Sequence, residues 1–358
     1  MRLPELNIGG LRARLPIVQG GMGIGVSLSR LASAVARAGG VGFISGVQIG
    51  FRDPLFYSDP VKANLAAVGE EIQKARALAP DGILGINFMT IQTHYEDYVR
   101  EAARNGIDVM VCGAGLPLSL PELVKGAKTR IMPVVSSVRA LRLIVTRWVK
   151  RYDRLPDGVV VEGPKAGGHL GYKMDELLDG TAQSLEDAAR DVIEYVGELE
   201  AKHGVHIPVI TGGGLLNHED VVRMLCLGAS GVQLGSAFVA TEECDASDAF
   251  KQAYVNAKAE DARIILSPTG LAARAIHNQF LDQISGDRTL PIEHCFYCMP
   301  EICRPECAPY CLSQALIQSA DGESGLVFCG ARVGEINEIT TVPALMARLC
   351  GESADRSA

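Results

Sequence analysis

The chain lacks the long apolar segments that insert into membranes. None of its 358 residues belongs to an uncharged apolar stretch of the length that a bilayer-spanning helix needs, about 18 residues or more. The first residues, 1–6, contain no apolar core of the kind found in secretory signals. We therefore expect a cytoplasmic protein with no membrane partner.

An excess of positive charge is also missing. The chain carries 34 Lys and Arg against 42 Asp and Glu, which gives a formal net charge of −8. Proteins that bind nucleic acid normally present a basic face to the phosphate backbone, so we expect no DNA or RNA partner. A dinucleotide-binding glycine fingerprint is absent too, so the sequence does not demand tightly held NAD(P)H. A small-molecule substrate is the remaining expectation.

Short apolar segments alternate with segments of helical periodicity along most of the chain. We expect strands within 16–22, 41–45, 83–88, 109–113, 130–135, 158–162, 208–211 and 231–234. We expect helices at 28–38, 60–78, 95–105, 121–126, around Trp148, at 184–203, at 217–227 and from about Ser247. The strand segments are continuously apolar, as is typical of parallel strands covered on both faces.

Eight strand–helix units over about 240 residues are typical of a closed parallel barrel. The alternative, an open doubly wound sheet, usually has fewer strands and a switch point in strand order. The sequence therefore predicts an α/β protein with a (β/α)8 TIM barrel in residues 1–258. Residues 259–358 are expected to form a C-terminal extension that packs on the barrel, with a cysteine-rich element at 295–311.

Glycine-rich turns follow three of the expected strands. Gly212–Gly214 follows the seventh strand and Gly235–Ser236 follows the eighth. In a TIM barrel these two loops commonly hold a phosphate, and bare backbone N–H groups bind it without lysine. The turn Gln19–Gly23 after the first strand has a similar composition, although it is also compatible with a plain strand-to-helix turn.

The most informative turn, 163–171, follows the expected strand at 158–162 and displays His169 between glycines. Glycines allow a flat ligand to lie directly against the backbone, at a cost in conformational entropy. A neutral imidazole can accept or donate a proton near physiological pH. A structural histidine in a tight turn is the alternative reading.

Taken together, these motifs resemble the nitronate monooxygenase family, formerly called 2-nitropropane dioxygenases. The segments that carry the resemblance are 16–22, 86–88, 162–171, 208–214 and 228–238. Flavin-dependent enoyl-ACP reductases share this fold and these motifs. The resemblance runs from about Leu15 to the C-terminus and implies an FMN-binding barrel.

The resemblance also implies roles for individual residues. The implied FMN-contacting set is Gln19, Gly20, Gly21, Met22, Asn87, Glu162, Gly167, Gly168, Gly212, Gly213, Gly214, Gln233, Gly235 and Ser236. His169 matches the family's active-site histidine, a general base or a substrate-orienting group. Lys165 departs from the family, in which glutamate is common at this position. A lysine that points inward would lower the pKa of His169 or attract an anionic substrate; otherwise it faces solvent.

A cysteine-rich element covers 295–311 and contains five of the ten cysteines. Crowded thiolates repel one another unless a cation or a cluster neutralises them, so zinc and an iron–sulfur cluster are both candidates. A loop of reduced thiols, or adventitious disulfides, is the third. A subgroup of the family has a similar cysteine pattern, which implies Cys295, Cys298, Cys303 and Cys311 as metal ligands and leaves Cys307 spare.

Three functions remain compatible with this sequence. The family's usual activity is FMN-dependent oxidation of alkyl nitronates with O₂ to a carbonyl compound and nitrite, and this is our prediction. The alternatives are an enoyl-thioester reductase that uses NAD(P)H, with His169 orienting the thioester carbonyl, and an electron-transfer flavoprotein with a cysteine-ligated cluster. The aromatic segment 51–57 is expected to pack internally, while a place on the substrate side and a contact in a homodimer stay open.

Overall fold

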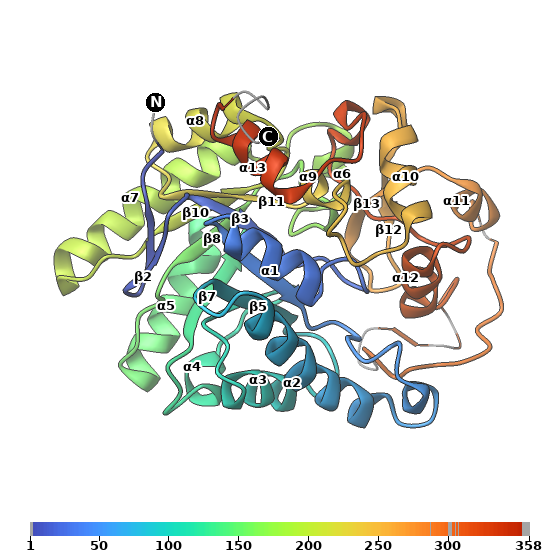
Figure 1. The fold of residues 1–358 in the computed structure, drawn as a ribbon, viewed down its shortest axis with the longest axis horizontal. Helices are drawn as coiled ribbons and strands as arrows, with labels where there is room; N and C mark the ends of the chain where they lie inside the picture. The colour runs from blue at the N-terminus through green and yellow to red at the C-terminus, as the bar shows by residue number, and fades with distance from the viewer. Residues whose placement is uncertain (1–2, 287, 300–302, 305, 307, 353–358) are drawn as a thin grey trace.

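The computed structural model describes residues 3–286, 288–299, 303–304, 306 and 308–352. Eight parallel strands close into a barrel, which confirms the predicted TIM-barrel fold (Figure 1). The barrel strands are β3 (Ile17–Gln19), β4 (Val41–Ser45), β5 (Ile83–Met89), β6 (Val109–Gly113), β7 (Arg130–Val135), β8 (Val159–Glu162), β10 (Val209–Gly212) and β11 (Gly231–Leu234). Each lies within a residue or two of its predicted segment, and β11 pairs with β3 to close the barrel.

Helices surround the barrel at the predicted places. They are α1 (Ser29–Arg37), α2 (Pro60–Leu78), α3 (Tyr95–Arg104), α4 (Leu120–Leu123), α5 (Val138–Tyr152), α7 (Leu185–His203), α8 (His218–Leu227) and α10 (Asp248–Asn256). Polar caps fix several of their starts: the side chains of Asp59 and Ser184 accept backbone N–H groups in the first turns of α2 and α7. Two short helices, α6 (Met174–Leu178) and α9 (Ser236–Val239), were not predicted.

An N-terminal hairpin closes the end of the barrel at which the strands begin. Strands β1 (Leu6–Ile8) and β2 (Leu11–Ala13) pair antiparallel. Leu6 and Ile8 are buried in the same apolar cluster as Val18, Phe43 and Met132, which fill the barrel interior. Three-residue strands carry too little periodicity to be recognised in a sequence, so the hairpin was missed.

The C-terminal extension lies at the other end of the barrel. In Figure 1 its orange segments lie on the side opposite β2, whereas its red helix near the C-terminus lies beside α8. Strand β13 (Ala272–Ile276) pairs antiparallel with β12 (Ala262–Leu266) on one side and with β9 (Gly168–His169), in the loop after β8, on the other. Because this sheet combines residues from both predicted domains, the extension builds part of the barrel's rim. The boundary at 258/259 stays a prediction.

Further helices complete the extension. They are α11 (Gln279–Gln283), α12 (Leu312–Asp321) and α13 (Val342–Leu349), of which α13 contacts α1 and α8. Short 3₁₀ turns occur at η1 (Pro54–Tyr57), η2 (Ala259–Asp261) and η3 (Val333–Glu335). Within the described ranges, no helix has both the length and the apolar composition needed to cross a membrane.

Two of the three aromatic residues in the segment after β4 pack inside the protein, as the sequence indicated, while Tyr57 is exposed. Phe51 and Phe56 are buried, and the Phe56 ring lies 4.8 Å from that of Phe296, measured between centroids. This contact joins the loop after β4 to the cysteine-rich element. The homodimer stays a prediction.

Candidate active site

A cavity of about 500 Å³ opens where the barrel strands end. It is lined by the turns after β3, β5, β8, β10 and β11 and by parts of the C-terminal extension. The predicted site residues on its wall are Gly20, Gly21, Met22, Asn87, Glu162, Gly167, Gly168, His169, Gly212, Gly213, Gly214, Gln233, Gly235 and Ser236. The structure thus brings the predicted cofactor residues and His169 to one cavity.

Gln19 is the exception among the predicted cofactor residues. It is fully buried in the barrel wall rather than on the cavity surface. Its Oε1 atom accepts the backbone N–H of Phe43 at 2.9 Å, and its Nε2 atom donates to the carbonyl of Gly20. These bonds hold β3 against β4, so the structure corrects the assignment of Gln19 from ligand contact to a structural role.

The turn after β10 has the features of an anion site. Gly213 and Gly214 have φ angles of +113° and +81°, which disfavour any side chain. Among the described residues, no hydrogen bond uses their backbone N–H groups. Across the cavity wall, the Ser236 Oγ atom accepts the N–H of Gly330 at 2.9 Å, which leaves its own hydroxyl proton for another acceptor. These donors suit a phosphate group.

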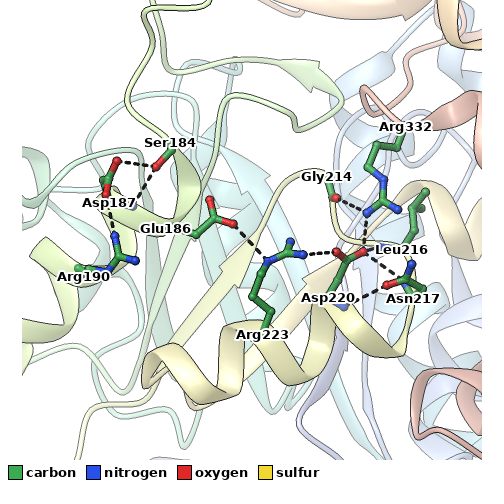
Figure 2. A network of polar contacts seen from close by, with 10 residues as sticks. All are labelled: Ser184, Glu186, Asp187, Arg190, Gly214, Leu216, Asn217, Asp220, Arg223 and Arg332. Atoms are coloured by element: carbon green, nitrogen blue, oxygen red, sulfur yellow. Dashed lines mark hydrogen bonds and ion pairs between the residues drawn. The ribbon is translucent and has the colours of Figure 1, made fainter.

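An arginine from the extension supports this turn (Figure 2). Arg332 donates to the Gly214 carbonyl at 3.1 Å and to Asp220 Oδ2 at 2.5 Å, and it also lines the cavity. Burial alone would raise the pKa of Asp220, but hydrogen bonds from the Leu216 N–H and from Arg332 lower it, so the carboxylate stays charged. Sequence reasoning missed Arg332 because it lies 118 positions from Gly214 and belongs to no motif.

Lys165 lies on the exposed rim beside this turn. A Cβ atom added to Gly214 would meet the Cβ atom of Lys165 at 2.7 Å. Lys165 lines the cavity and is also exposed to solvent at its mouth. Its position therefore combines features of both predictions, a lysine that points inward and one that faces solvent. Burial, rather than this lysine, lowers the pKa of His169.

His169 is held in place by the C-terminal extension. Its backbone pairs with Ala273 of β13, and its Nε2 atom lies 2.9 Å from the Oγ atom of Ser267. The edge of its ring contacts Phe328, with 5.3 Å between ring centroids. Burial lowers the pKa of His169 to about 4, so the imidazole is uncharged at neutral pH.

Asn87 and Gly21 form a tight contact at the ends of β5 and β3. The Oδ1 atom of Asn87 is buried and has no hydrogen-bond partner among the described residues, although a buried amide oxygen normally has one. A Cβ atom added to Gly21 would lie 2.2 Å from this oxygen. These two features suit a flat ligand that carries a hydrogen-bond donor and approaches the bare backbone. An isoalloxazine ring, flat and with one N–H between two carbonyls, fits both requirements.

Glu162 ends β8 and lines the same cavity. Burial raises the pKa of its carboxyl to about 7, so the side chain holds its proton over much of the acidic and neutral range. Its backbone carbonyl accepts the hydroxyl of Tyr172 at 2.9 Å. A protonated carboxyl supplies one more hydrogen-bond donor to the cavity.

The cysteine-rich element lines a second cavity, of about 390 Å³. Cys295, Cys298, Cys303 and Cys311 all lie on its wall as free thiols, which does not support the disulfide alternative. Over the described residues, no group of three or more His, Cys, Asp or Glu side chains is placed to hold a metal ion. Cys307 lies outside the described residues.

Known proteins share this architecture. A family model described as nitronate monooxygenase matches residues 7–352. The chain belongs to the nitronate monooxygenase family. This family and the chain's structural neighbours are flavin-dependent oxidoreductases.

Individual relatives differ in their named activities. A probable nitronate monooxygenase of Bacillus subtilis is 25% identical, over 94% of this chain and 95% of its own length. A dehydrogenase of Mycobacterium tuberculosis, named for an octahydro-indene carboxyl-CoA substrate, is 26% identical over 76% of this chain. The match covers 66% of that dehydrogenase, just under two thirds of its length.

Solved structures confirm the fold. The FabK protein of Thermotoga maritima superposes with a TM-score of 0.71 at 25% identity, over 94% of this chain and 91% of its own. A nitroalkane oxidase of Streptomyces ansochromogenes gives a TM-score of 0.68 at 22% identity, over 95% and 96%. At this level of identity, the oxidase is informative about the fold alone.

Proposed function

We propose that this chain is an FMN-dependent nitronate monooxygenase, which oxidises alkyl nitronates with O₂ to a carbonyl compound and nitrite. The phosphate of FMN would bind at Gly213, Gly214 and Ser236, and the ring would lie against Gly21 and Gly168. Bound FMN supplies the redox chemistry by exchanging electrons with the substrate and with O₂. The protein supplies position and electrostatics.

The observation that carries this proposal is an uncharged histidine beside the cofactor residues. A group with a pKa of about 4 is a weak base, poorly matched to removing a proton from carbon at neutral pH. A nitronate has already lost that proton, and its two oxygens share a negative charge that needs hydrogen-bond donors. His169 therefore suits the orientation of a nitronate better than the deprotonation of a neutral nitroalkane.

A second candidate is reduction of an enoyl thioester with NAD(P)H. It is favoured by the similarity to FabK, an enoyl-ACP reductase, and to a dehydrogenase named for a coenzyme A ester. In that reaction His169 would donate a hydrogen bond to the thioester carbonyl. The glycine turns and the phosphate site would serve both reactions equally.

Anaerobic stopped-flow reduction of the FMN-loaded protein separates the two candidates. We expect flavin bleaching by ethyl nitronate and, in air, nitrite and acetaldehyde in equal amounts. NADH and NADPH should reduce the flavin slowly. Fast bleaching by either nucleotide, together with reduction of an enoyl-CoA and no nitrite from the nitronate, would replace the first proposal with the second.

The state of the cysteines is informative about the cellular compartment of this enzyme. Every cysteine that the structure describes is a free thiol. Free thiols persist in the reducing cytoplasm, and we propose that the protein is located there. Fractionation of the native cells with an antibody to the chain tests this, and recovery outside the cytoplasm would contradict it.

A further inference from the structure

Four cysteines surround one space in the C-terminal extension. Cys295, Cys298, Cys303 and Cys311 come from a segment of 17 residues and line the same cavity of about 390 Å³. Apolar side chains such as Ile292 and Leu312 make up much of the remaining wall. Side-chain packing alone gives no reason for four thiols to line an open space of this size.

The size of this space discriminates between ligands. Zinc would draw four sulfurs to about 2.3 Å from a single point, and a cavity of about 390 Å³ leaves more room than one such ion fills. In a cluster with four irons, each cysteine binds a different corner of an inorganic core. Four thiols on the wall of one open cavity suit such a core.

Hydrogen bonds already point at two of the sulfurs. The Ser313 hydroxyl donates to Cys298 Sγ at 3.2 Å, and the backbone N–H of Tyr297 donates to Cys295 Sγ at 3.4 Å. Hydrogen bonds to ligand sulfurs are among the factors that tune the potential of a protein-bound cluster. The donors come from α12 and from the element itself, so both sides of the cavity contribute.

The element is anchored to the barrel beside the flavin cavity. The backbone N–H of Thr93, in the loop after β5, donates to the Cys298 carbonyl at 2.8 Å, and the Thr93 hydroxyl donates to the Tyr297 carbonyl at 2.5 Å. Phe296, Cys298, Met299 and Leu312 line both cavities. A single layer of side chains therefore separates the cysteine cavity from the candidate active site.

We propose that Cys295, Cys298, Cys303 and Cys311 bind an iron–sulfur cluster next to the flavin site. The proposal goes beyond nitronate oxidation and does not depend on it, since the cluster is a separate site with its own spectroscopic signature. Three alternatives are outcomes of the test: zinc, thiols without metal, and a cluster held by other cysteines.

Iron and acid-labile sulfide are measured on the full chain after anaerobic purification. We expect about four of each per chain, as for a [4Fe–4S] cluster, and a low-temperature EPR signal after reduction by dithionite. About two of each would contradict the four-iron core, since a [2Fe–2S] cluster also has four cysteine ligands. One equivalent of zinc with no iron would overturn the proposal. So would metal-free protein that remains metal-free after incubation with iron, sulfide and a thiol reductant.

Replacement of single cysteines identifies the ligands. Cys303→Ser should lose most of the iron and the EPR signal while it keeps its FMN. Cys226→Ser is the matched control, because Cys226 is exposed on α8, far from the element in the chain, and should leave the iron content unchanged. Full iron content in Cys303→Ser would remove this residue from the ligand set and overturn the assignment.

Alkylation of the unmodified protein covers the case in which the variants do not fold. In cluster-loaded protein, Cys295, Cys303 and Cys311 should resist iodoacetamide while Cys226 reacts. After an iron chelator and ferricyanide remove the cluster and a thiol reductant restores the thiols, these three cysteines should be labelled as well, as read by peptide mass spectrometry. Equal labelling before and after that treatment would contradict the proposal without any substitution.

Discussion

The Nε2 atom of His169 lies 2.9 Å from the Oγ atom of Ser267, although 98 residues separate them in the chain. His169 belongs to the loop after β8, and Ser267 follows β12 in the C-terminal extension. The pairing of β9 with β13 brings the two segments together. The extension thus sets the position of the imidazole, so the barrel alone does not complete the site.

Replacing Ser267 with alanine should lower turnover without loss of FMN. The imidazole would lose its hydrogen-bond partner, which is worth about 1 kcal/mol, or several-fold in rate. Steady-state oxidation of ethyl nitronate should show a lower kcat with a smaller change in KM. Ser267→Thr, which keeps a hydroxyl, should recover part of the rate.

Ser285→Ala is the control for this change, because Ser285 is an exposed serine of the same extension. It should behave like the unmodified enzyme. An unchanged kcat in Ser267→Ala, with FMN fully bound, would show that the contact does not position His169 for catalysis.

His169 itself should matter far more than its partner. His169→Asn keeps a polar side chain of similar reach but removes the imidazole. Because the imidazole would no longer orient the nitronate oxygens, we expect FMN to remain bound and turnover to fall about 10²-fold or more. The flavin spectrum reports the first result, and nitrite release reports the second. Retention of the full rate would leave His169 with a purely structural role.

The barrel was predictable because its signals are local and repeated. The apolar run at 159–161, for example, is buried and flanked by glycine, and Ser184 caps the helix that follows. Each strand–helix unit repeats such signals, so eight of them define the fold. The glycine turns could be recognised equally well. Glycine at a strand end costs conformational entropy on folding, so a run of glycines there indicates that a ligand or another segment approaches the backbone closely.

What the sequence could not show are contacts between distant segments. Ser267 reaches the site through a three-stranded sheet, and Arg332 reaches it by hydrogen bonds to Gly214 and Asp220. No local sequence pattern predicts either contact. Gln19 was predicted to contact the ligand for a related reason. Its place in a glycine-rich motif is visible in the sequence, but the hydrogen bond from Phe43 that holds its side chain in the barrel wall is not. Motifs identify which backbone approaches a ligand, but side-chain direction depends on tertiary packing.

The buried carboxyl of Glu162 should make stability depend on pH. Its pKa is about 4.5 in the unfolded chain and about 7 in the folded one. Between these values the folded chain keeps a proton that the unfolded chain has lost, so stability falls as the pH rises through this window. The total loss is at most about 3 kcal/mol.

Urea unfolding of FMN-free protein at pH 5 and pH 8 measures this effect. Glu162→Gln has no such proton, so its free energy of unfolding should change less between the two pH values and should exceed that of the unmodified chain at pH 8. Glu260→Gln, an exposed carboxyl in η2, should retain the original pH dependence. An identical pH dependence in Glu162→Gln would show that the carboxyl ionises normally.

Gly214→Ala tests the phosphate turn, since two effects oppose a side chain there. The φ angle of +81° strains alanine by about 1 kcal/mol, and the new Cβ atom would lie 2.7 Å from that of Lys165. The turn must shift, which moves the N–H groups that face the phosphate. We expect the Kd for FMN, measured by quenching of flavin fluorescence, to rise tenfold or more, about 1.4 kcal/mol.

Gly180→Ala separates the two causes, because Gly180 has a similar φ of +69° with no atom within 4 Å of an added Cβ. It should lose stability and keep its FMN affinity; equal FMN affinity in both variants would place the phosphate elsewhere.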